Sequence, residues 1–540
     1  MFYRKAQRNR KPSYQSHTDA ANAASDNGGK PPISAGLADN LAYLRQELGD
    51  SPDMIVRTFE IGGNRIPAGA VYMDGITDKD MVNEYILKSL MIEAGEAMNP
   101  DEKPDILAYL KANALTIGEV HLLKDWDCII LSVLSGDTVI FLDGSPEAIS
   151  GNTKGGEQRT ITEPSTQVVI RGPKDGFTES IGTNVSLVRR RIKSSSVRLE
   201  PFKIGQTTKT NVAVMYIQGK AEDHVVQLLR ERLSGIQIEA LTGSELLEEL
   251  IQDQKKSPFS TLINTERPDT VANHLLDGRI AIFVDGTPFN LIAPTTFLMN
   301  FLSTEDYYTR PEAVAAIIIV RYAALIISLF APSIYIAAIT FHQEMIPTPL
   351  LLSLASQRES VPFPAFIEAL IMEFTFEILR EAGIRMPRAI GQAVSIVGAL
   401  VLGQAAVEAG IISSAMVIVV AITGISSFAN PSYNMALSIR LIRFFLMVAA
   451  ALFGFYGIAI FSIILISHMC SLSSFGVPYM TIKTPSVPEA ERKTLFGIPL
   501  TKEKTKPQPA PDSGGSGAGG NDQAQPASAP SNLLNESGSS

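Results

Sequence analysis

AVAAIIIVRYAALIISLFAPSIYIAAITF (313–341) is an apolar run in which Arg321 is the single charged residue. About 20 consecutive apolar residues are enough for a helix to cross a lipid bilayer. Three further apolar runs follow at 389–407, 411–428 and 444–466, and the first two are joined by a short connection that predicts a helical hairpin. The sequence therefore predicts an integral membrane protein with an all-α transmembrane bundle.

The number of spans depends on the segment 348–388, which is apolar but interrupted by acidic residues. It fits a fifth crossing, a re-entrant piece or an interfacial helix. Arg380, Arg385 and Arg388 favour a cytoplasmic loop there, hence five spans, whereas the lysines after 483 favour a cytoplasmic C-terminus and an even number. Four or five spans therefore both remain open.

One predicted helix carries a strip of small residues, Gly391, Ser395, Ala399 and Gly403, which recur at every fourth position. Such a strip lets two helix backbones approach closely within a bilayer. We interpret these four residues as helix-packing positions without chemistry of their own. Arg321, inside the first run, is expected to be paired, to point into the bundle or to reach the headgroups.

The two ends of the chain are polar and of low complexity. Residues 1–38 lack any periodic apolar pattern, and residues 476–540 are mostly rich in Pro, Gly, Ser and Ala, so we expect disorder in both. The basic start has no apolar segment behind it, which predicts that no secretory signal is present. The N-terminal region is therefore expected in the cytoplasm, with the bundle at 301–475.

Between these parts, one pattern of elements occurs twice. A strand at 68–75, a helix at 78–91 and the strand IFLDGSP are matched by a strand at 211–219, a helix at 221–233 and IFVDGTP. Nearly equal spacing of the matched strings suggests an internal duplication, although an Asp-Gly turn after a strand is also common by chance. The fold class expected is an α/β soluble region of two related subdomains, 39–165 and 166–300, followed by the transmembrane bundle.

Composition excludes several classes of function. The net charge of −9 argues against nucleic-acid binding, and two cysteines argue against a disulfide scaffold. The six histidines lack the spacing of a metal site, and the phosphate-loop, serine-hydrolase and zinc-protease motifs are missing. We therefore expect no enzyme, no metal and no cofactor.

A basic, turn-rich string, RGPKDGFTESIGTNVSLVRRRIKS (171–194), is the most unusual one in the soluble region. Its charged residues predict an interface between subunits or subdomains. The alternative is a connector whose arginines bridge neighbouring acids, because turn chemistry alone explains the Gly and Pro residues. The interface candidates are Arg171, Lys174, Asp175, Arg189 and Arg190.

Three acidic residues, Glu373, Glu377 and Glu381, fall on one face of a predicted helix at 364–381, and Glu368 points the other way. Carboxylates in an apolar stretch should face water or a basic partner, and in a ring of subunits they would form cation-selective rings. These three residues are the pore-lining candidates. The alternative is an amphipathic interfacial helix in which Arg380 pairs with Glu377.

Several strings between about Leu41 and Tyr479 resemble the A subunits of GerA-type spore germination receptors. They include RGPKDGFTES with the following RRR, HLLDGRIAIFVDGTP (274–288), STEDYYTR (303–310), the long segment 341–387, AIGQAVSIVGALVLGQAAVEAGI (389–411) and SSFGVPYM (473–480). After Tyr479 the chain departs from the family pattern. A paralogue encoded with the SpoVA proteins is similar over the same region and is the alternative within the family.

The resemblance implies a location and partners. It implies a multi-pass protein of the spore inner membrane that works with a multi-spanning B-type subunit and a lipoprotein C-type subunit. It also implies a homo-oligomer in contact with membrane lipid that conducts ions when a nutrient signal arrives. The alternative function is a non-conducting scaffold that couples a nutrient-sensing partner to later germination proteins. Polar residues inside the bundle would favour the channel, and an apolar interior would favour the scaffold.

Overall fold

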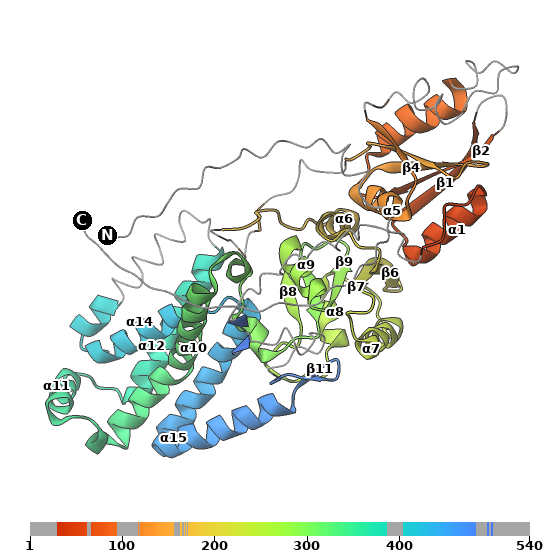
Figure 1. Ribbon diagram of the computed structural model, residues 1–540. Coiled ribbons are helices and arrows are strands. Elements are labelled where there is room, and N and C mark those ends of the chain that lie inside the picture. The colour runs from red at the N-terminus through yellow and green to blue at the C-terminus, as the bar shows by residue number, and fades with distance from the viewer. Residues whose placement is uncertain are drawn as a thin grey trace, which may run out of the picture. The chain divides into compact units, whose positions relative to one another are not determined.

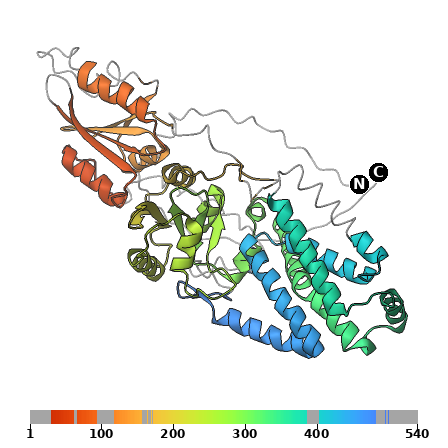
Figure 2. The same cartoon turned by 180° about the vertical axis from the view of Figure 1, so that it is seen from behind.

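The computed structural model describes residues 30–61, 66–93, 117, 119–155, 163–164, 167, 169, 171–385, 403–481, 494–495 and 498–499. Two five-stranded antiparallel sheets with flanking helices precede a helical bundle (Figures 1 and 2). We call the first sheet with its helices subdomain 1 and the second subdomain 2. The domain boundaries at 165/166 and 300/301 stay predictions.

Subdomain 1 has the strand order β1-β2-β4-β5-β3, and subdomain 2 has the equivalent order β6-β7-β9-β10-β8. The elements of subdomain 1 are α1 (Leu37–Glu47), β1 (Met54–Ile61), β2 (Ile66–Met73), α2 (Lys79–Met81), η1 (Val82–Leu87), η2 (Ser89–Glu93), β3 (Val120–Leu123), α5 (Trp126–Ser135), β4 (Thr138–Leu142) and β5 (Ala148–Gly151). Those of subdomain 2 are α6 (Ile181–Arg191), β6 (Val197–Ile204), β7 (Thr210–Ile217), α7 (Asp223–Ser234), α8 (Ser244–Ile251), β8 (Ile263–Thr265), α9 (Pro268–Leu276), β9 (Ile280–Val284) and β10 (Asn290–Ala293).

The alternation of side chains along the strands builds a core on both faces of each sheet. In β2, Val71 belongs to the core under α1 and α5, and the next residue, Tyr72, belongs to the core on the other face. In β7, Met215 packs with α6 and α9, whereas Tyr216 packs with α7 and α8. The central strands β4 and β9 are buried throughout, which explains why both read as unbroken apolar runs.

The two Asp-Gly strings perform the same structural task in both subdomains. Asp143 accepts a hydrogen bond from the backbone N–H of Leu37 at the start of α1 (3.0 Å), and Asp285 accepts one from Ile181 at the start of α6 (3.2 Å). Both glycines have a positive φ, 87° at Gly144 and 84° at Gly286. Each string thus connects two paired antiparallel strands, β4 with β5 or β9 with β10, and also satisfies the N-terminus of a helix distant in sequence. The repeated contacts are what an internal duplication predicts.

The strand register agrees with the repeat as well. Gly69 of β2 lies opposite Phe141 of β4, and Ala213 of β7 lies opposite Phe283 of β9. The small residue in each pair faces the same aromatic residue of the repeated string. The two sheets therefore share order, register and helix contacts.

Short 3-10 helices connect subdomain 2 to a bundle of longer helices. The connecting helices are η4 (Phe297–Phe301) and η5 (Thr304–Tyr308). The bundle comprises α10 (Pro311–Thr340), η6 (Gln343–Met345), α11 (Thr348–Arg358), α12 (Ala365–Arg385), α14 (Ser414–Phe428) and α15 (Tyr433–Ser471). Short strand pairs follow, β11 (Ser473–Ser474) with β12 (Val477–Pro478) and β13 (Thr494–Leu495) with β14 (Ile498–Pro499).

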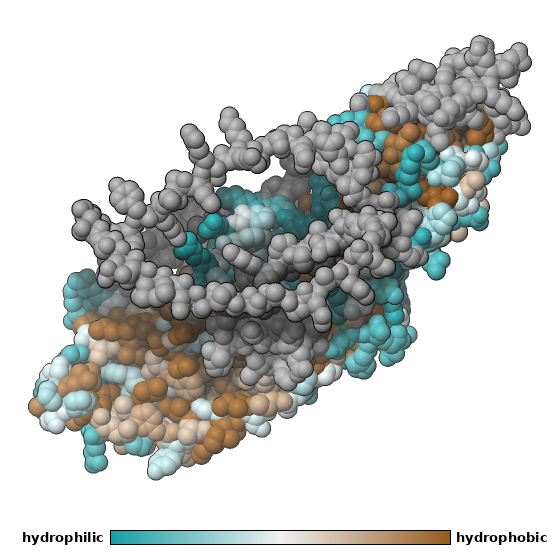
Figure 3. Space-filling model, viewed as in Figure 1, coloured by the Kyte–Doolittle hydropathy of each residue, from teal (hydrophilic) through white to brown (hydrophobic). Residues whose placement is uncertain are grey.

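Within the described residues, two helices, α10 and α15, are long and apolar enough to cross a membrane. Their outward side chains are exposed and apolar; Ile319 is 66% exposed and Ile463 is 68% exposed. Figure 3 shows apolar side chains gathered on the surface made by the bundle helices. A soluble helix would bury such residues in its core, so this surface is suited to lipid. The predicted bundle of four or five spans is not established by these two helices.

Arg321 lies on α10 about three turns after its start and is held by Asp306 of η5 (2.6 Å). It also donates to the backbone carbonyl of Phe301 (2.8 Å). The first turns of α10 therefore belong to the connection with subdomain 2. The part of α10 beyond Arg321 is about 29 Å long, close to the thickness of a bilayer's hydrocarbon core.

The apolar run 444–466, predicted as one span, is broken in the structure. Gly454, near the middle of α15, has φ 58° and ψ −140°, and the helix changes direction there. Ser438 donates to the carbonyl of Pro258, while His468 lies 3.0 Å from the hydroxyl of Ser257. Ser438 and His468 are 30 positions apart and would be about 45 Å apart on a straight helix. They contact two adjacent residues, so α15 folds back on itself (Figures 1 and 2). We call 433–453 its first arm and 455–471 its second arm.

Glycine is required at the turn between the two arms. A Cβ on Gly454 would lie 2.7 Å from Cε1 of His342 and 3.0 Å from Cβ of Phe341, directly after the end of α10. A Cβ on Gly457 would clash with the carbonyl oxygen of Ala449. The turn of α15 thus lies at the end of α10 that is distant from subdomain 2.

The expected boundary at 475/476, between the bundle and a mostly disordered tail, passes through a described hairpin. Residues on both sides of it form the hairpin β11–β12, and Tyr479 is completely buried. Phe475 and Val477 of this segment pack in the core of subdomain 2, whereas Tyr479 packs in the core of the bundle, and composition alone reveals neither.

Candidate functional site

A cluster of charged residues lies inside the bundle, where α12 packs against the first arm of α15. Glu373 meets Arg443 at 3.0 Å, and the side chains of both are 1% exposed. Glu377, one turn further along α12, meets Arg440 at 3.2 Å and Arg443 at 3.6 Å. We call Glu373, Glu377, Arg440 and Arg443 the charge cluster.

The local sequence explains why these side chains meet. Glutamates four residues apart on α12 occupy one face, and arginines three residues apart on α15 occupy another. The helices bring the two faces together because apolar residues beside them pack in a shared core, including Met372, Met447 and Ala450. The cluster thus has four charges with a net charge of zero in apolar surroundings.

Hydrogen bonding within the charge cluster is incomplete. Among the described residues, neither carboxylate oxygen of Glu373 accepts a hydrogen bond and no guanidinium nitrogen of Arg443 donates one. Their attraction therefore rests on charge without the directed bonds that usually accompany buried ion pairs.

Arg380 is the third arginine of this region. Its guanidinium lies 4.9 Å above the ring centroid of Phe428, a cation–π contact with α14. Arg440, rather than the predicted Arg380, pairs with Glu377. The local pair expected for an interfacial helix is therefore replaced by a contact between helices.

The remaining acids of α12 lie elsewhere. Glu381 is 62% exposed and pairs with Arg385 on its own helix (2.7 Å). Glu368, on the opposite face as predicted, is buried, meets Arg358 of α11 at 3.3 Å and accepts hydrogen bonds from Ser413. The three pore-lining candidates thus differ, since two of them are in the charge cluster and Glu381 is at the surface.

The interface candidates of the soluble region have separate contacts. Arg189 is buried and binds Asp53 (2.9 Å) and Ser51 (2.8 Å) of subdomain 1, so it joins the two subdomains within this chain. Arg190 also reaches subdomain 1, where it donates to the carbonyl of Gly155 (2.5 Å), and burial lowers the pKa of Arg190. These two arginines therefore have partners inside the chain.

The turn before α6 has different partners. Asp175 pairs with Arg191 (2.6 Å), Lys174 pairs with Glu163 (2.9 Å), and Arg171 is exposed. Glu163 lies outside the turn, so this part of the string fits the connector interpretation. The role of all five candidates between subunits stays a prediction.

Of the four helix-packing candidates, Gly391, Ser395 and Ala399 lie outside the described residues. Gly403 lies in the helical stretch 403–408, and a Cβ there would be 3.5 Å from Val417 of α14. That distance is an ordinary van der Waals contact. The proposed close approach therefore stays a prediction.

Sequence reasoning missed Arg440 and Arg443. They lie directly before the predicted span 444–466 and read as the basic flank of a membrane helix. Their spacing of three residues beside apolar neighbours was the available signal, because it places both charges on one helix face.

Residues 42–509 match the family described as Bacillus/Clostridium GerA spore germination protein. The chain belongs to the GerA family. It is 47% identical over 477 residues to spore germination protein KA of Bacillus subtilis (strain 168), which covers 88% of this chain and 87% of that protein. It is 39% identical over 445 residues to spore germination protein A1 of the same organism, covering 82% and 90% of the two chains.

A crystal structure of the N-terminal domain of the A subunit of the Bacillus megaterium spore germinant receptor GerK3 is also similar to this GerA family member. The two are 40% identical, with a TM-score of 0.40. The match covers 49% of this chain and 98% of that domain.

Proposed function

We propose that this GerA family member is the A-type membrane subunit of a spore germinant receptor and forms an oligomeric cation channel. Its relatives are named as spore germination proteins, which supports a role in germination. The proposed location is the inner membrane of the spore, with the soluble region in the cytoplasm. The proposed partners are copies of itself and the B-type and C-type subunits.

The charge cluster is the observation that carries the channel proposal. Ionised groups inside apolar helices are costly and usually mark a path for ions or a moving charge. A scaffold that only transmits force would be served by an apolar interior, which needs no compensation of buried charge. The charged interior of this bundle therefore favours the channel over the scaffold.

The geometry further suggests how the channel would be closed. In the described arrangement Arg440 and Arg443 neutralise Glu373 and Glu377, so neither carboxylate is free to attract a cation. Separation of α15 from α12 would free both acids, and in a ring of subunits they would line a cation-selective path. Glu381, exposed near the end of α12, would extend the acidic stripe.

Potassium efflux from liposomes tests the proposal, with this chain reconstituted alone and together with its receptor partners. The double variant Glu373→Gln/Glu377→Gln is expected to lower potassium selectivity over chloride, because the acidic ring loses its charge. Glu359→Gln, at the exposed end of α11, is the matched control. Reconstituted receptor that releases no potassium in any combination would support the scaffold instead.

The number of crossings also enters the proposal. Both arms of α15 contact subdomain 2, the first arm through Ser438 and the second through His468, whether or not each arm crosses completely. We therefore propose an even number of crossings, with the C-terminal residues on the same side as the soluble region. This agrees with the lysine-rich C-terminal stretch under the positive-inside rule.

A further inference from the structure

One short connector of subdomain 2, residues 252–262 between α8 and β8, contacts both arms of α15 and the segment that follows α15. Pro258 accepts a hydrogen bond from Ser438 on the first arm. On the second arm, Ser257 lies 3.0 Å from His468, and Gln254 donates to the carbonyl of Ser471 (3.2 Å). The connector therefore joins the two arms of the folded helix.

The segment after α15, residues 472–479, is fixed to the same connector, and we call it the clasp. Asp253 accepts a hydrogen bond from Ser473 (2.6 Å), and the carbonyl of Thr261 accepts one from Ser474 (2.6 Å). The ring of Tyr479 packs 6.4 Å from the ring of Phe259. Both polar and aromatic contacts thus hold the clasp to the connector.

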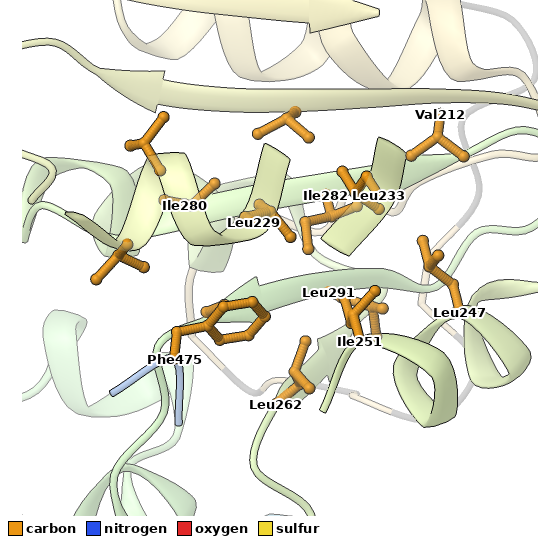
Figure 4. Close-up of a cluster of buried hydrophobic side chains, with 14 of the residues drawn as sticks. Val212, Leu229, Leu233, Leu247, Ile251, Leu262, Ile280, Ile282, Leu291 and Phe475 are labelled. Atoms are coloured by element: carbon orange, nitrogen blue, oxygen red, sulfur yellow. The ribbon is translucent and has the colours of Figure 1, made fainter. Parts of the chain in front are cut away.

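Phe475 anchors the clasp in the core of subdomain 2. It is 1% exposed and belongs to the same apolar cluster as Leu229, Leu262 and Leu291 (Figure 4). The guanidinium of Arg232 lies 4.7 Å above its ring. An aromatic side chain buried in this way makes the clasp part of subdomain 2 rather than a loose continuation of the bundle.

The contacts of the first arm are adjacent to the charge cluster. Arg440 follows Ser438 by two residues and Arg443 by five, which is about 3 and 8 Å along the helix. A second contact, from Ser432 to Asn300 (3.0 Å), fixes the start of the same arm. A rigid helical segment between these contacts and the arginines would carry a displacement directly.

We infer that the connector 252–262 is the element through which subdomain 2 regulates the charge cluster. Its contacts with α15 hold Arg440 and Arg443 against the glutamates of α12, and a movement of subdomain 2 withdraws them. This inference rests on the proposed channel, since it assigns the closed state to the paired cluster. It adds the regulating element, which lies in the soluble region.

Basal potassium leak from liposomes containing the full chain tests the inference. Ser438→Ala and His468→Ala each remove one side-chain hydrogen bond to the connector and are expected to raise the leak about 2- to 12-fold each, the range for a net hydrogen bond. Ser462→Ala is the matched control, because Ser462 donates to the carbonyl four residues earlier, as Ser438 also does, without a connector contact. Its leak should equal that of the unmodified protein.

A double-mutant comparison shows whether the effect passes through the charge cluster. In a Glu373→Gln/Glu377→Gln background, Ser438→Ala should no longer change the leak, because the arginines have lost the partners that they would leave. If the leak changes by the same factor in both backgrounds, the connector does not act on the cluster and the inference is wrong. If no protein in the series conducts, the proposed channel itself fails.

A reversible cross-link keeps the test independent of misfolding. Ser257→Cys with His468→Cys, in a Cys128→Ser/Cys470→Ser background, joins the connector to the second arm. Oxidation should lower the leak below that of the reduced protein, and a reducing agent should restore it in the same sample. An oxidised sample that leaks as much as the reduced one would overturn the inference.

Discussion

Removal of Arg443 should destabilise the bundle far more than removal of a surface arginine. In Arg443→Met, Glu373 loses the cation that lies 3.0 Å away, and Glu377 keeps only Arg440 at 3.2 Å. Leaving one partner of a buried ion pair uncompensated costs about 3–5 kcal/mol. The loss is expected near the upper end, because both members of this pair are 1% exposed.

The double variant Glu373→Met/Arg443→Met should recover most of that loss. It removes both charges of the pair, and replacement of a buried pair by apolar side chains is commonly neutral or stabilising by about 1–4 kcal/mol. Glu377 and Arg440 remain as a neutral pair. The double variant is therefore expected to be at least about 3 kcal/mol more stable than Arg443→Met.

Equilibrium unfolding in mixed detergent micelles, followed by far-ultraviolet circular dichroism, measures these free energies. Arg385→Met is the control, because Arg385 and Glu381 are 78% and 62% exposed and such pairs contribute about 1 kcal/mol or less. If Arg443→Met costs no more than Arg385→Met, the cluster is not buried as described. If the double variant is as unstable as the sum of its single changes, the two residues do not interact.

Three other predictions follow from the same geometry. A membrane-impermeant maleimide should label the exposed Cys470 only after cells are permeabilised, and labelling of intact cells, absent in Cys470→Ser, would place the end of α15 on the opposite side. Gly454→Ala should cost at least about 1–3 kcal/mol in the micelle assay, because φ is positive and the new Cβ would lie 2.7 Å from His342; an unchanged stability would refute the turn. Burial beside Arg279 holds the pKa of His274 well below its usual 6.5. The contribution of His274 to the free energy of unfolding is therefore fully present above pH 6.5. As the pH falls below 6.5, that contribution is lost at about 1.4 kcal/mol per pH unit. In His274→Asn, whose side-chain oxygen can accept the same bond from Arg279, that part of the pH dependence should disappear from unfolding curves between pH 6.5 and 5.

The repeated strings show how far local sequence reaches. IFLDGSP and IFVDGTP predict buried strands ended by a turn, and β4 and β9 end there. Hydrogen-bonding rules alone do not say which groups the aspartates satisfy. Asp143 and Asp285 bind helix starts more than 100 residues away in sequence, so their partners depend on how the sheet brings distant segments together.

The break in α15 also could not be predicted from local sequence. Hydropathy measures composition over a window, and a glycine among apolar residues leaves that average unchanged. Gly454 was visible in the sequence, but glycine is tolerated in many membrane helices. The contacts of both arms with the connector 252–262 decide that the chain turns back there.

The sequence by itself determined the apolar segments, the repeated strands and the acidic face of α12, because these follow from composition and from the fixed periods of helices and strands. It also placed Glu373 and Glu377 on one face. Only the tertiary structure decided that Arg440 and Arg443 neutralise them and that Phe475 belongs to the core of subdomain 2. Buried charges and aromatic anchors take their partners from packing between distant segments, and no local period in the sequence encodes that packing.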